Sequence, residues 1–360
     1  MNNSKNVANY IFGKDGISEL PKLLENRRKT EKDYVIYFID MFFEKNEKAL
    51  GKLPISKNDE VIYVPTENEP KTEYINNYRD LIFELGKGLP ITIVAIGGGI
   101  VLDTGKAVAN LLTNNGDAED YQGWDLVEKA GIYKIGVPTI SGTGAEASRT
   151  CVMTNSKTGL KLGMNSDFTI YDQLILDSNL TKTVPKEQYF YTGMDTYIHC
   201  IESLNGNYRN AIGDAYSREA INLIREIFHS ENMMSDENRD KMMVASYLGG
   251  CAVANSFVGI IHPLSAGLSV VLNTHHCIGN CITMNAMEEF YPKEYKEFFE
   301  MAEKQNIKIP KGIAKNISDE VFEKLYKSSI IHEKPLANAL GKEFKNILTK
   351  EKVKSLFKNM

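Results

Sequence analysis

The sequence contains little cysteine and no excess of positive charge. Its five cysteines are scattered and form no CxxC pair, so neither a disulfide framework nor a thiolate zinc site is expected. Lysine and arginine together number 42 against 47 aspartates and glutamates, which gives a net charge of −5. Because this balance provides no basic stripe to follow a phosphate backbone, we expect no nucleic-acid partner.

Long apolar runs are also missing. No stretch reaches the roughly 20 apolar residues that a membrane span requires, and the opening MNNSKNVANYIFGKDG has no apolar signal core. We therefore expect a soluble protein of the reducing cytoplasm, without a membrane partner. The 360 residues suit two domains, each long enough to bury a core.

Short apolar runs alternate with amphipathic segments in the first half of the chain. YVIYFID ends at Asp40, VIYV covers 61–64, ITIVAI covers 91–96, and KIGVP ends at Pro138. Such runs are typical of buried parallel strands. Apolar residues recur at helical spacing over 102–112, so the third run is followed by a glycine turn and a helix.

The pattern changes after Pro185. No proline occurs from Lys186 to His262, and the apolar residues follow a 3.6-residue period. The segment DSNLTKTVPKEQ clusters Ser, Asn, Thr and Pro where a helix can start. We predict an α/β domain over residues 1–183 and an all-α domain over residues 184–360.

One carboxylate and three imidazoles have the spacing of a divalent-metal site. Asp195 and His199 are four residues apart, so both lie on one face of a helix. His262 and His276 lie in an apolar segment, where an imidazole without a partner is expensive to bury. Imidazole together with carboxylate suits Zn²⁺ or Fe²⁺. The alternative is that each histidine is a separately hydrogen-bonded core residue.

A glycine cluster, GGGIVLDTGK, stands between a predicted strand and a predicted helix. At Gly97, Gly98 and Gly99, backbone N–H groups and the helix N-terminus could face a pyrophosphate. Glycine clusters also make tight turns without any ligand. The acidic residue of the common dinucleotide fingerprint follows the glycines by about 20 residues, whereas Asp40 precedes them here. The cluster is therefore not a standard Rossmann fingerprint.

A second polar loop, PTISGTGAEASRT, follows the strand that ends at Pro138. Thr139, Ser141 and Thr143 could bind phosphate or ribose there, because open α/β sheets bind ligands at the carboxyl ends of their strands. The alternative is a solvated turn with a helix cap. Arg149 could hold the carboxylate of an acidic substrate in a bidentate pair, or it could be an ordinary surface arginine.

With these three motifs in this order, the chain resembles the iron-containing, group III alcohol dehydrogenase family, which is related in fold to dehydroquinate synthase and glycerol dehydrogenase. The resemblance covers nearly the whole chain. It implies an N-terminal dinucleotide-binding domain and a helical C-terminal domain, with NAD(P) and a divalent metal meeting in the cleft between them. The implied metal ligands are Asp195, His199, His262 and His276. The implied cofactor-binding residues are Asp40, Gly97, Gly98, Gly99, Asp103, Thr139, Ser141, Thr143 and Lys161. Asp40 suggests a preference for NAD over NADP.

Longer phrases are similar to one branch of this family, the 3-deoxy-D-manno-octulosonate (Kdo) 8-oxidases. They include YQGWDLV, LGMNSD, YTGMDTYIHCIESL and HHCIGNC. The resemblance implies oxidation of the C8 alcohol of Kdo to an aldehyde, in the synthesis of a lipopolysaccharide amino sugar. It would make a small acidic sugar the substrate, Arg149 its carboxylate anchor, and a downstream aminotransferase a pathway partner.

One position departs from the family. Many members carry a further histidine four residues after the third ligand, and this chain has Ala266 there. His275, beside His276, is a candidate replacement as a base, although adjacent helical residues point in different directions. A metal acting as a Lewis acid would favour the alkoxide of a bound alcohol and reduce the need for a base.

Three other interpretations compete with Kdo oxidation. One is a reductase of a small aldehyde such as lactaldehyde or butyraldehyde, with the same metal and cofactor. Another is a catalytically silent binding protein, and the third is a cyclising lyase of the dehydroquinate synthase type. The sequence leaves open the physiological metal and the final electron acceptor. A homodimer is expected only from the general frequency of symmetric dimers.

Overall fold

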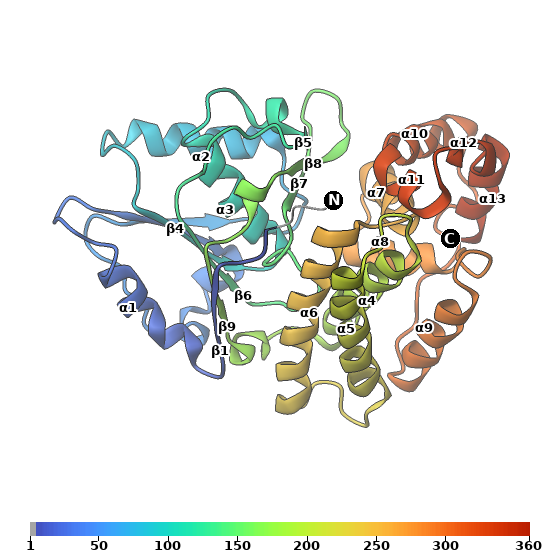
Figure 1. Cartoon of the computed structure of the whole chain (residues 1–360), viewed down its shortest axis with the longest axis horizontal. Coiled ribbons are helices and arrows are strands. Elements are labelled where there is room, and N and C mark those ends of the chain that lie inside the picture. Colours follow the sequence, from blue (N-terminus) through green and yellow to red (C-terminus); the bar gives the residue numbers. More distant parts are fainter. Residues whose placement is uncertain (1–4) are drawn as a thin grey trace. The chain divides into compact units, whose positions relative to one another are not determined.

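The computed structural model describes residues 5–360, which form two compact units that divide between Val184 and Pro185 (Figure 1). The boundary lies one residue beyond the predicted one. Each unit has its own architecture. The first is α/β and the second is helical, which confirms the predicted fold class.

A six-stranded parallel sheet in the order β1-β9-β6-β4-β2-β3 forms the centre of the N-terminal unit. The strands span Asn9–Phe12 (β1), Val35–Asp40 (β2), Glu60–Val64 (β3), Thr92–Gly97 (β4), Lys134–Pro138 (β6) and Gln173–Leu176 (β9). Four of them are the predicted apolar runs, and β2, β4 and β6 are buried along their whole length. Strands buried on both faces lose the polar alternation of a half-exposed strand, which explains why these runs are continuously apolar.

Helices cover both faces of this sheet. They span Leu20–Glu25 (α1), Thr72–Glu84 (α2) and Gly99–Leu111 (α3). Alternate residues of the strands, such as Val94 and Ile96, pack in one apolar cluster with Leu20 and Leu24 of α1. On the other face Ala95 faces α3, where a Cβ at Gly105 would lie 2.8 Å from the Ala95 Cβ. Gly105 therefore lets α3 lie close to the sheet.

A smaller sheet of order β5-β8-β7 completes the N-terminal unit. Its strands span Gly123–Trp124 (β5), Thr150–Thr154 (β7) and Lys161–Asn165 (β8), and β7 and β8 pair antiparallel. The sequence did not predict these strands. Each is short, and β7 alternates buried and partly buried residues instead of forming a continuous apolar run.

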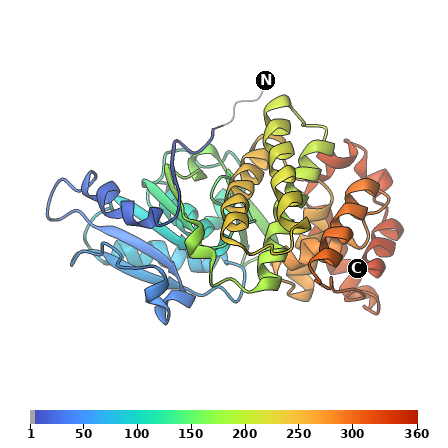
Figure 2. The same cartoon turned by 90° about the horizontal axis from the view of Figure 1, so that it is seen from below.

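Within residues 185–360, which the structure describes completely, the regular elements are all helices (Figure 2). They span Lys186–Asn205 (α4), Ala211–His229 (α5), Asp236–Ser256 (α6), Ile261–Leu272 (α7), His276–Met284 (α8), Pro292–Lys304 (α9), Asp319–Ile330 (α10), Glu333–Leu340 (α11), Phe344–Ile347 (α12) and Lys350–Asn359 (α13). The α4 helix is buried around its circumference from Tyr189 to Ser203. A polar side chain on this stretch therefore needs a partner inside the unit.

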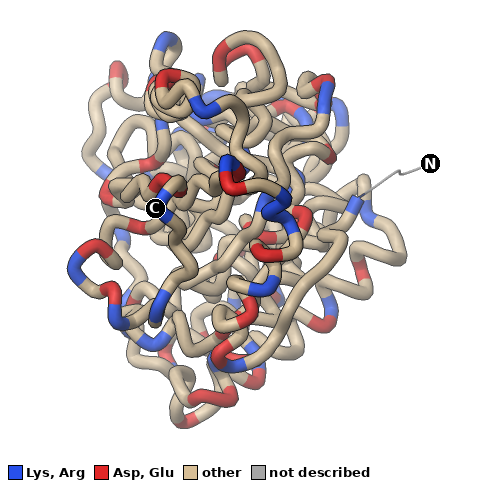
Figure 3. The backbone as a smooth tube through the Cα atoms, turned by 90° about the vertical axis from the view of Figure 1, so that its left-hand side faces the viewer, with Lys and Arg blue, Asp and Glu red and all other residues tan. Residues whose placement is uncertain are grey.

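The described residues include no single helix that is long and apolar enough to cross a membrane, and only α6 and α7, bent by 106° at their junction, pass that test of length and composition as a pair. On the face drawn in Figure 3, positive and negative residues are intermixed.

Candidate metal and nucleotide sites

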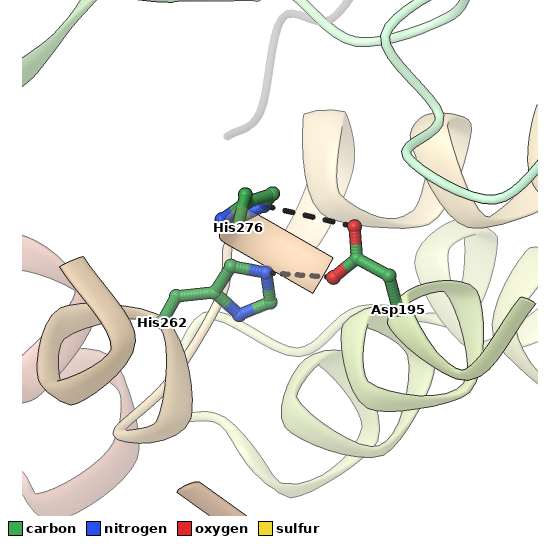
Figure 4. A group of neighbouring side chains, drawn as sticks. All are labelled: Asp195, His262 and His276. Atoms are coloured by element: carbon green, nitrogen blue, oxygen red, sulfur yellow. Dashed lines mark ion pairs between the residues drawn. The ribbon is translucent and has the colours of Figure 1, made fainter. Parts of the chain in front are cut away.

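The predicted metal ligands come from three helices of the C-terminal unit. Asp195 and His199 lie one turn apart on α4, as their spacing predicted. His262 is in the first turn of α7, and His276 is the first residue of α8. Figure 4 shows Asp195, His262 and His276 facing one another.

These three side chains form a compact group of metal-binding atoms. One ligand atom from each lies within 4.8 Å of the others. The Nε2 atom of His262 is 3.5 Å from Asp195 Oδ1, and the Nε2 atom of His276 is 3.6 Å from Asp195 Oδ2. Ligands at about 2.1 Å around a tetrahedral ion are about 3.4 Å apart. The donor set and its spacing therefore fit a divalent metal.

His199, the fourth predicted ligand, lies beside this group. Its Nε2 atom is 3.8 Å from Asp195 Oδ1, and its ring stacks on His262 with a centroid separation of 4.6 Å. Burial lowers the pKa of His199 to about 4, against the opposing charge of Asp195. The ring is therefore neutral near pH 7, as a metal ligand must be. Its Nδ1 atom is buried without a hydrogen-bond partner among the described residues.

The charges at the site favour a bound cation. Burial alone would raise the pKa of Asp195, but the neighbouring His199, His276 and His262 outweigh it and hold the pKa well below its usual range. Burial would lower the pKa of His262, but Glu202 and Asp195 outweigh it and raise the pKa to about 9. A metal ion would compete with that proton for the nitrogen of His262.

The sequence did not single out two residues that contact this group. Asn280 donates from Nδ2 to Asp195 Oδ1 at 2.6 Å. Glu202 contacts His262 Nδ1 through Oε2. Helical spacing could have identified both as neighbours of ligands, because Glu202 follows His199 by three residues and Asn280 follows His276 by four.

The candidate base His275 is exposed at the N-cap of α8, and Ala266 is buried on α7. The group of metal-binding atoms found among the described residues does not include His275. Its role as a base stays a prediction.

The glycine cluster and the polar loop meet at the carboxyl ends of neighbouring strands in the N-terminal unit. Gly97 at the end of β4 pairs with Pro138 at the end of β6, and Asp40 ends the adjacent strand β2. A Cβ at Gly97 would lie 3.2 Å from the Asp40 Cβ. Gly98 is the N-cap of α3, so the free N–H groups at the start of the helix begin at Gly99.

The polar loop lies against the glycine turn. The N–H group of Thr139 donates to the carbonyl of Gly97 at 3.0 Å, and a Cβ at Gly99 would lie 3.1 Å from Thr143 Oγ1. Thr139 and Ser141 are buried. Glycines, hydroxyls and a helix N-terminus thus lie together here, and such groups can bind the phosphates of a dinucleotide.

Asp40 is buried beside the glycine turn. Its Oδ1 atom accepts from the N–H group of Phe42 at 3.0 Å and from Thr66 Oγ1 at 3.2 Å. Burial raises the pKa of Asp40, and these hydrogen bonds oppose that rise. Its contact with ribose and its preference for NAD stay predictions.

Two other predicted cofactor residues have internal partners. Asp103 lies 3.0 Å from Lys106 Nζ through Oδ1, and it accepts from the N–H group of Val152 at 2.8 Å through Oδ2. Lys161 lies 3.0 Å from Glu69 Oε1. These ion pairs connect segments of the N-terminal unit, and the cofactor contacts of both residues stay predictions.

Arg149 lies between two carboxylates. Its Nη2 atom contacts Asp125 Oδ1, and its Nε atom is 3.1 Å from Asp167 Oδ1. The side chain is only 15% exposed. Two aspartates already balance its charge, so a substrate carboxylate would have to compete with them.

Comparisons with known proteins identify the family of this chain. The iron-containing alcohol dehydrogenase profile matches residues 8–178, and the profile of the C-terminal part of that family matches residues 189–340. The sulfoacetaldehyde reductase of Bilophila wadsworthia is 34% identical over 219 residues, which are 60% of this chain and 55% of that enzyme. The chain thus spans about half the length of the curated relatives it matches.

Solved structures share the fold. A 1,3-propanediol oxidoreductase superimposes with a TM-score of 0.83 at 20% identity, covering 99% of both chains. The sulfoacetaldehyde reductase of Bifidobacterium kashiwanohense in complex with NAD⁺ superimposes with a TM-score of 0.81 at 20% identity, covering 99% of this chain and 98% of that one. From the two profiles, which together match most of its length, the chain belongs to the iron-containing alcohol dehydrogenase family, whose members bind a divalent metal and NAD(H).

Proposed function

We propose that this protein is a divalent-metal-dependent oxidoreductase that interconverts a primary alcohol and an aldehyde with NAD(H). The grouping of Asp195, His262 and His276 within 4.8 Å is the observation that carries the proposal. A silent binding protein would have no need for such a donor set. A cyclising lyase would need more basic phosphate-binding residues than the sequence provides.

The two candidate sites would have different chemical roles. A divalent ion would supply Lewis-acid stabilisation of the alcohol oxygen, and a nicotinamide would accept the hydride. Asp195 and the three histidines would hold the ion. The turn at Gly97, Gly98 and Gly99 would present backbone N–H groups and the N-terminus of α3 to the cofactor phosphates.

Within this class, we propose Kdo as the substrate, oxidised at C8. The support is the similarity of long phrases such as YQGWDLV and YTGMDTYIHCIESL to the Kdo 8-oxidase branch. Arg149 is the proposed carboxylate anchor, and to act so it would exchange an aspartate partner for the substrate.

A second candidate is the reduction of a small aldehyde, which one observation favours. A relative that is 34% identical over the matched region is named a sulfoacetaldehyde reductase. Sulfoacetaldehyde is small and anionic, so it too could use a cation such as Arg149. Sulfoacetaldehyde is smaller than Kdo, and the enzyme would reduce it, whereas it would oxidise Kdo.

Substrate profiling of metal-reconstituted protein tests both candidates. Kdo with NAD⁺, and sulfoacetaldehyde or lactaldehyde with NADH, would be followed by NADH absorbance, with oxygen uptake recorded in parallel. NADH formation together with an 8-aldehyde product would support Kdo oxidation. Turnover of the aldehydes alone would assign the protein to the small-aldehyde reductases.

We expect Arg149→Ala to lower kcat/KM for Kdo by about 10- to 100-fold, the size of one lost hydrogen bond between charged groups. A neutral alcohol should change by less than about threefold on the same argument. The matched control is Asp125→Asn, which breaks an ion pair of the same arginine but keeps its charge. Equal losses on both substrates would reject the anchor.

A further inference from the structure

Glu202 is a buried carboxylate with two donors in front of it. It lies on α4 and is 1% exposed. Its Oε1 atom accepts from the N–H group of Ile261 at 2.5 Å, and its Oε2 atom contacts His262 Nδ1. A buried charge is tolerated only when it is paired in this way.

The first of these contacts fixes the start of α7. Ile261 is the first residue of that helix, and the N-cap residue Ile260 provides no side-chain hydrogen bond. Glu202 therefore supplies the missing acceptor from a different helix, where a negative charge also suits the helix dipole. The backbone at Gly259 lies close to the carboxylate of Glu202. A Cβ at this glycine would lie 3.1 Å from Glu202 Oε1.

The second contact determines which nitrogen of His262 carries the proton. An ionised carboxylate can only accept, so the Nδ1 atom beside Glu202 must donate. The lone pair of the neutral ring is then on Nε2, which lies 3.5 Å from Asp195 Oδ1.

Asn280 also lies beside the ring of His262. Its amide nitrogen donates to Asp195 Oδ1 at 2.6 Å. That nitrogen also faces His262 Nε2 at 3.2 Å. When Nε2 carries no proton, as it must to bind a metal, it can accept from this nitrogen.

We propose that Glu202 is a positioning residue that holds the proton of His262 on Nδ1 and thereby presents Nε2 to the divalent metal. This inference rests on the metal centre of the proposed function. It adds a carboxylate–histidine–metal relay, in which the outer carboxylate orients the ring and makes the ligand more basic.

Glutamine cannot replace this carboxylate, because it has one acceptor oxygen where Glu202 uses two. If that oxygen accepted from Ile261, the NH₂ group would face Nδ1 and favour the proton on Nε2. If the oxygen faced Nδ1, the NH₂ group would meet the N–H group of Ile261. We therefore expect Glu202→Gln to weaken Zn²⁺ binding by about 10- to 100-fold, as is typical for outer partners of metal ligands.

The experiment measures Zn²⁺ affinity by competition with a chromophoric chelator in full-length wild-type protein, Glu202→Gln and Glu187→Gln. Glu187 is an exposed glutamate in the first turn of the same helix, and its variant should bind as wild type does. Thermal unfolding of the metal-free proteins shows whether the variants are folded. A purely structural role for Glu202 would lower the unfolding temperature without a selective loss of Zn²⁺ affinity.

A second measurement does not depend on the variant folding. In zinc-loaded wild-type protein labelled with ¹⁵N at histidine, the signals of His262, assigned with His262→Ala, should show a protonated Nδ1 and a zinc-bound Nε2. Zinc on Nδ1, or equal Zn²⁺ affinity in wild type and a folded Glu202→Gln, would overturn this inference alone. Failure of the wild type to bind Zn²⁺ would overturn the proposed function as well.

Discussion

Asp195 is the residue on which the proposed metal centre depends. It is completely buried, and three imidazoles lie within 4 Å of its carboxylate: His199 at 3.8 Å, His262 at 3.5 Å and His276 at 3.6 Å. A buried carboxylate costs several kcal/mol unless another charge compensates it. His199 cannot provide that charge near pH 7, because burial lowers its pKa to about 4. His262, whose pKa is raised to about 9, supplies one positive charge in the metal-free protein, and a divalent ion would supply two.

Asp103 and Lys106 form a comparable pair in the N-terminal unit, and here the lysine provides the charge. The Lys106 side chain is completely buried, and its Nζ atom also donates to the carbonyls of Ala145, at 2.9 Å, and Thr150. Lys106→Met leaves Asp103 without its cation, and we expect the free energy of unfolding to fall by about 3–5 kcal/mol. Denaturant unfolding measures this loss.

The same pair tests the cofactor role of Asp103. Its Oδ1 atom is in an ion pair with Lys106 and its Oδ2 atom accepts from Val152, so we expect Asp103→Asn to lower NAD⁺ affinity no more than Lys106→Met does. A selective loss of NAD⁺ affinity in Asp103→Asn, measured by calorimetry, would show instead that this carboxylate contacts the cofactor.

Among the secondary-structure elements, α3 carries the candidate nucleotide site because it lies close to the sheet. Gly105 faces Ala95 of β4, and a methyl group at Gly105 would come within 2.8 Å of the Ala95 Cβ. Contacts this short between two carbon atoms require one element to move. The helix N-terminus at Gly98 depends on the same packing.

Gly105→Ala tests this packing. Alanine favours a helix over glycine by about 1 kcal/mol, whereas overpacking costs about 1–3 kcal/mol. We expect a net loss of stability and weaker NAD⁺ binding, with partial recovery in the Ala95→Gly/Gly105→Ala double variant. A single variant as stable as wild type in denaturant unfolding would contradict this account of the packing.

The strands and helices that the sequence predicted are those with a strong local period. Continuous apolar runs identified β2, β3, β4 and β6, and helical spacing identified α3 and the pair Asp195 and His199. The small sheet was missed because β5 has only two residues and because β7 and β8 lack the continuous apolar runs of the large sheet. Periodicity describes which face of an element is buried, not which distant segment it contacts.

The same limit explains the outcome at the candidate site. The grouping of Asp195, His262 and His276 could be predicted, because Asp and His are scarce in apolar segments. The partners of Arg149 could not, because Asp125 and Asp167 reach it only in the folded chain. The contact between Glu202 and His262 spans 60 residues, and no spacing rule predicts it.

For the whole molecule, the two units have separate candidate sites, so each ligand should stabilise mainly the unit that binds it. At a Zn²⁺ concentration about 100 times its Kd, binding contributes about 2.7 kcal/mol. We expect Zn²⁺ to slow hydrogen exchange in α4, α7 and α8, and NAD⁺ to slow it around β4 and α3. Hydrogen exchange is measured by mass spectrometry of peptic peptides. If Zn²⁺ slowed exchange only in the N-terminal unit, the metal would bind elsewhere than at α4, α7 and α8.

We expect NAD-coupled turnover to depend on a metal held by Asp195, His262 and His276. The most direct measurement is a titration of metal-stripped protein with Zn²⁺ or Fe²⁺ while NADH-coupled turnover of Kdo and of the small aldehydes is followed. We predict that activity is absent without metal, returns with one equivalent per chain, and does not return in His262→Ala, which still binds NAD⁺. Full turnover by the metal-stripped protein, or restored activity in His262→Ala, would contradict the claim.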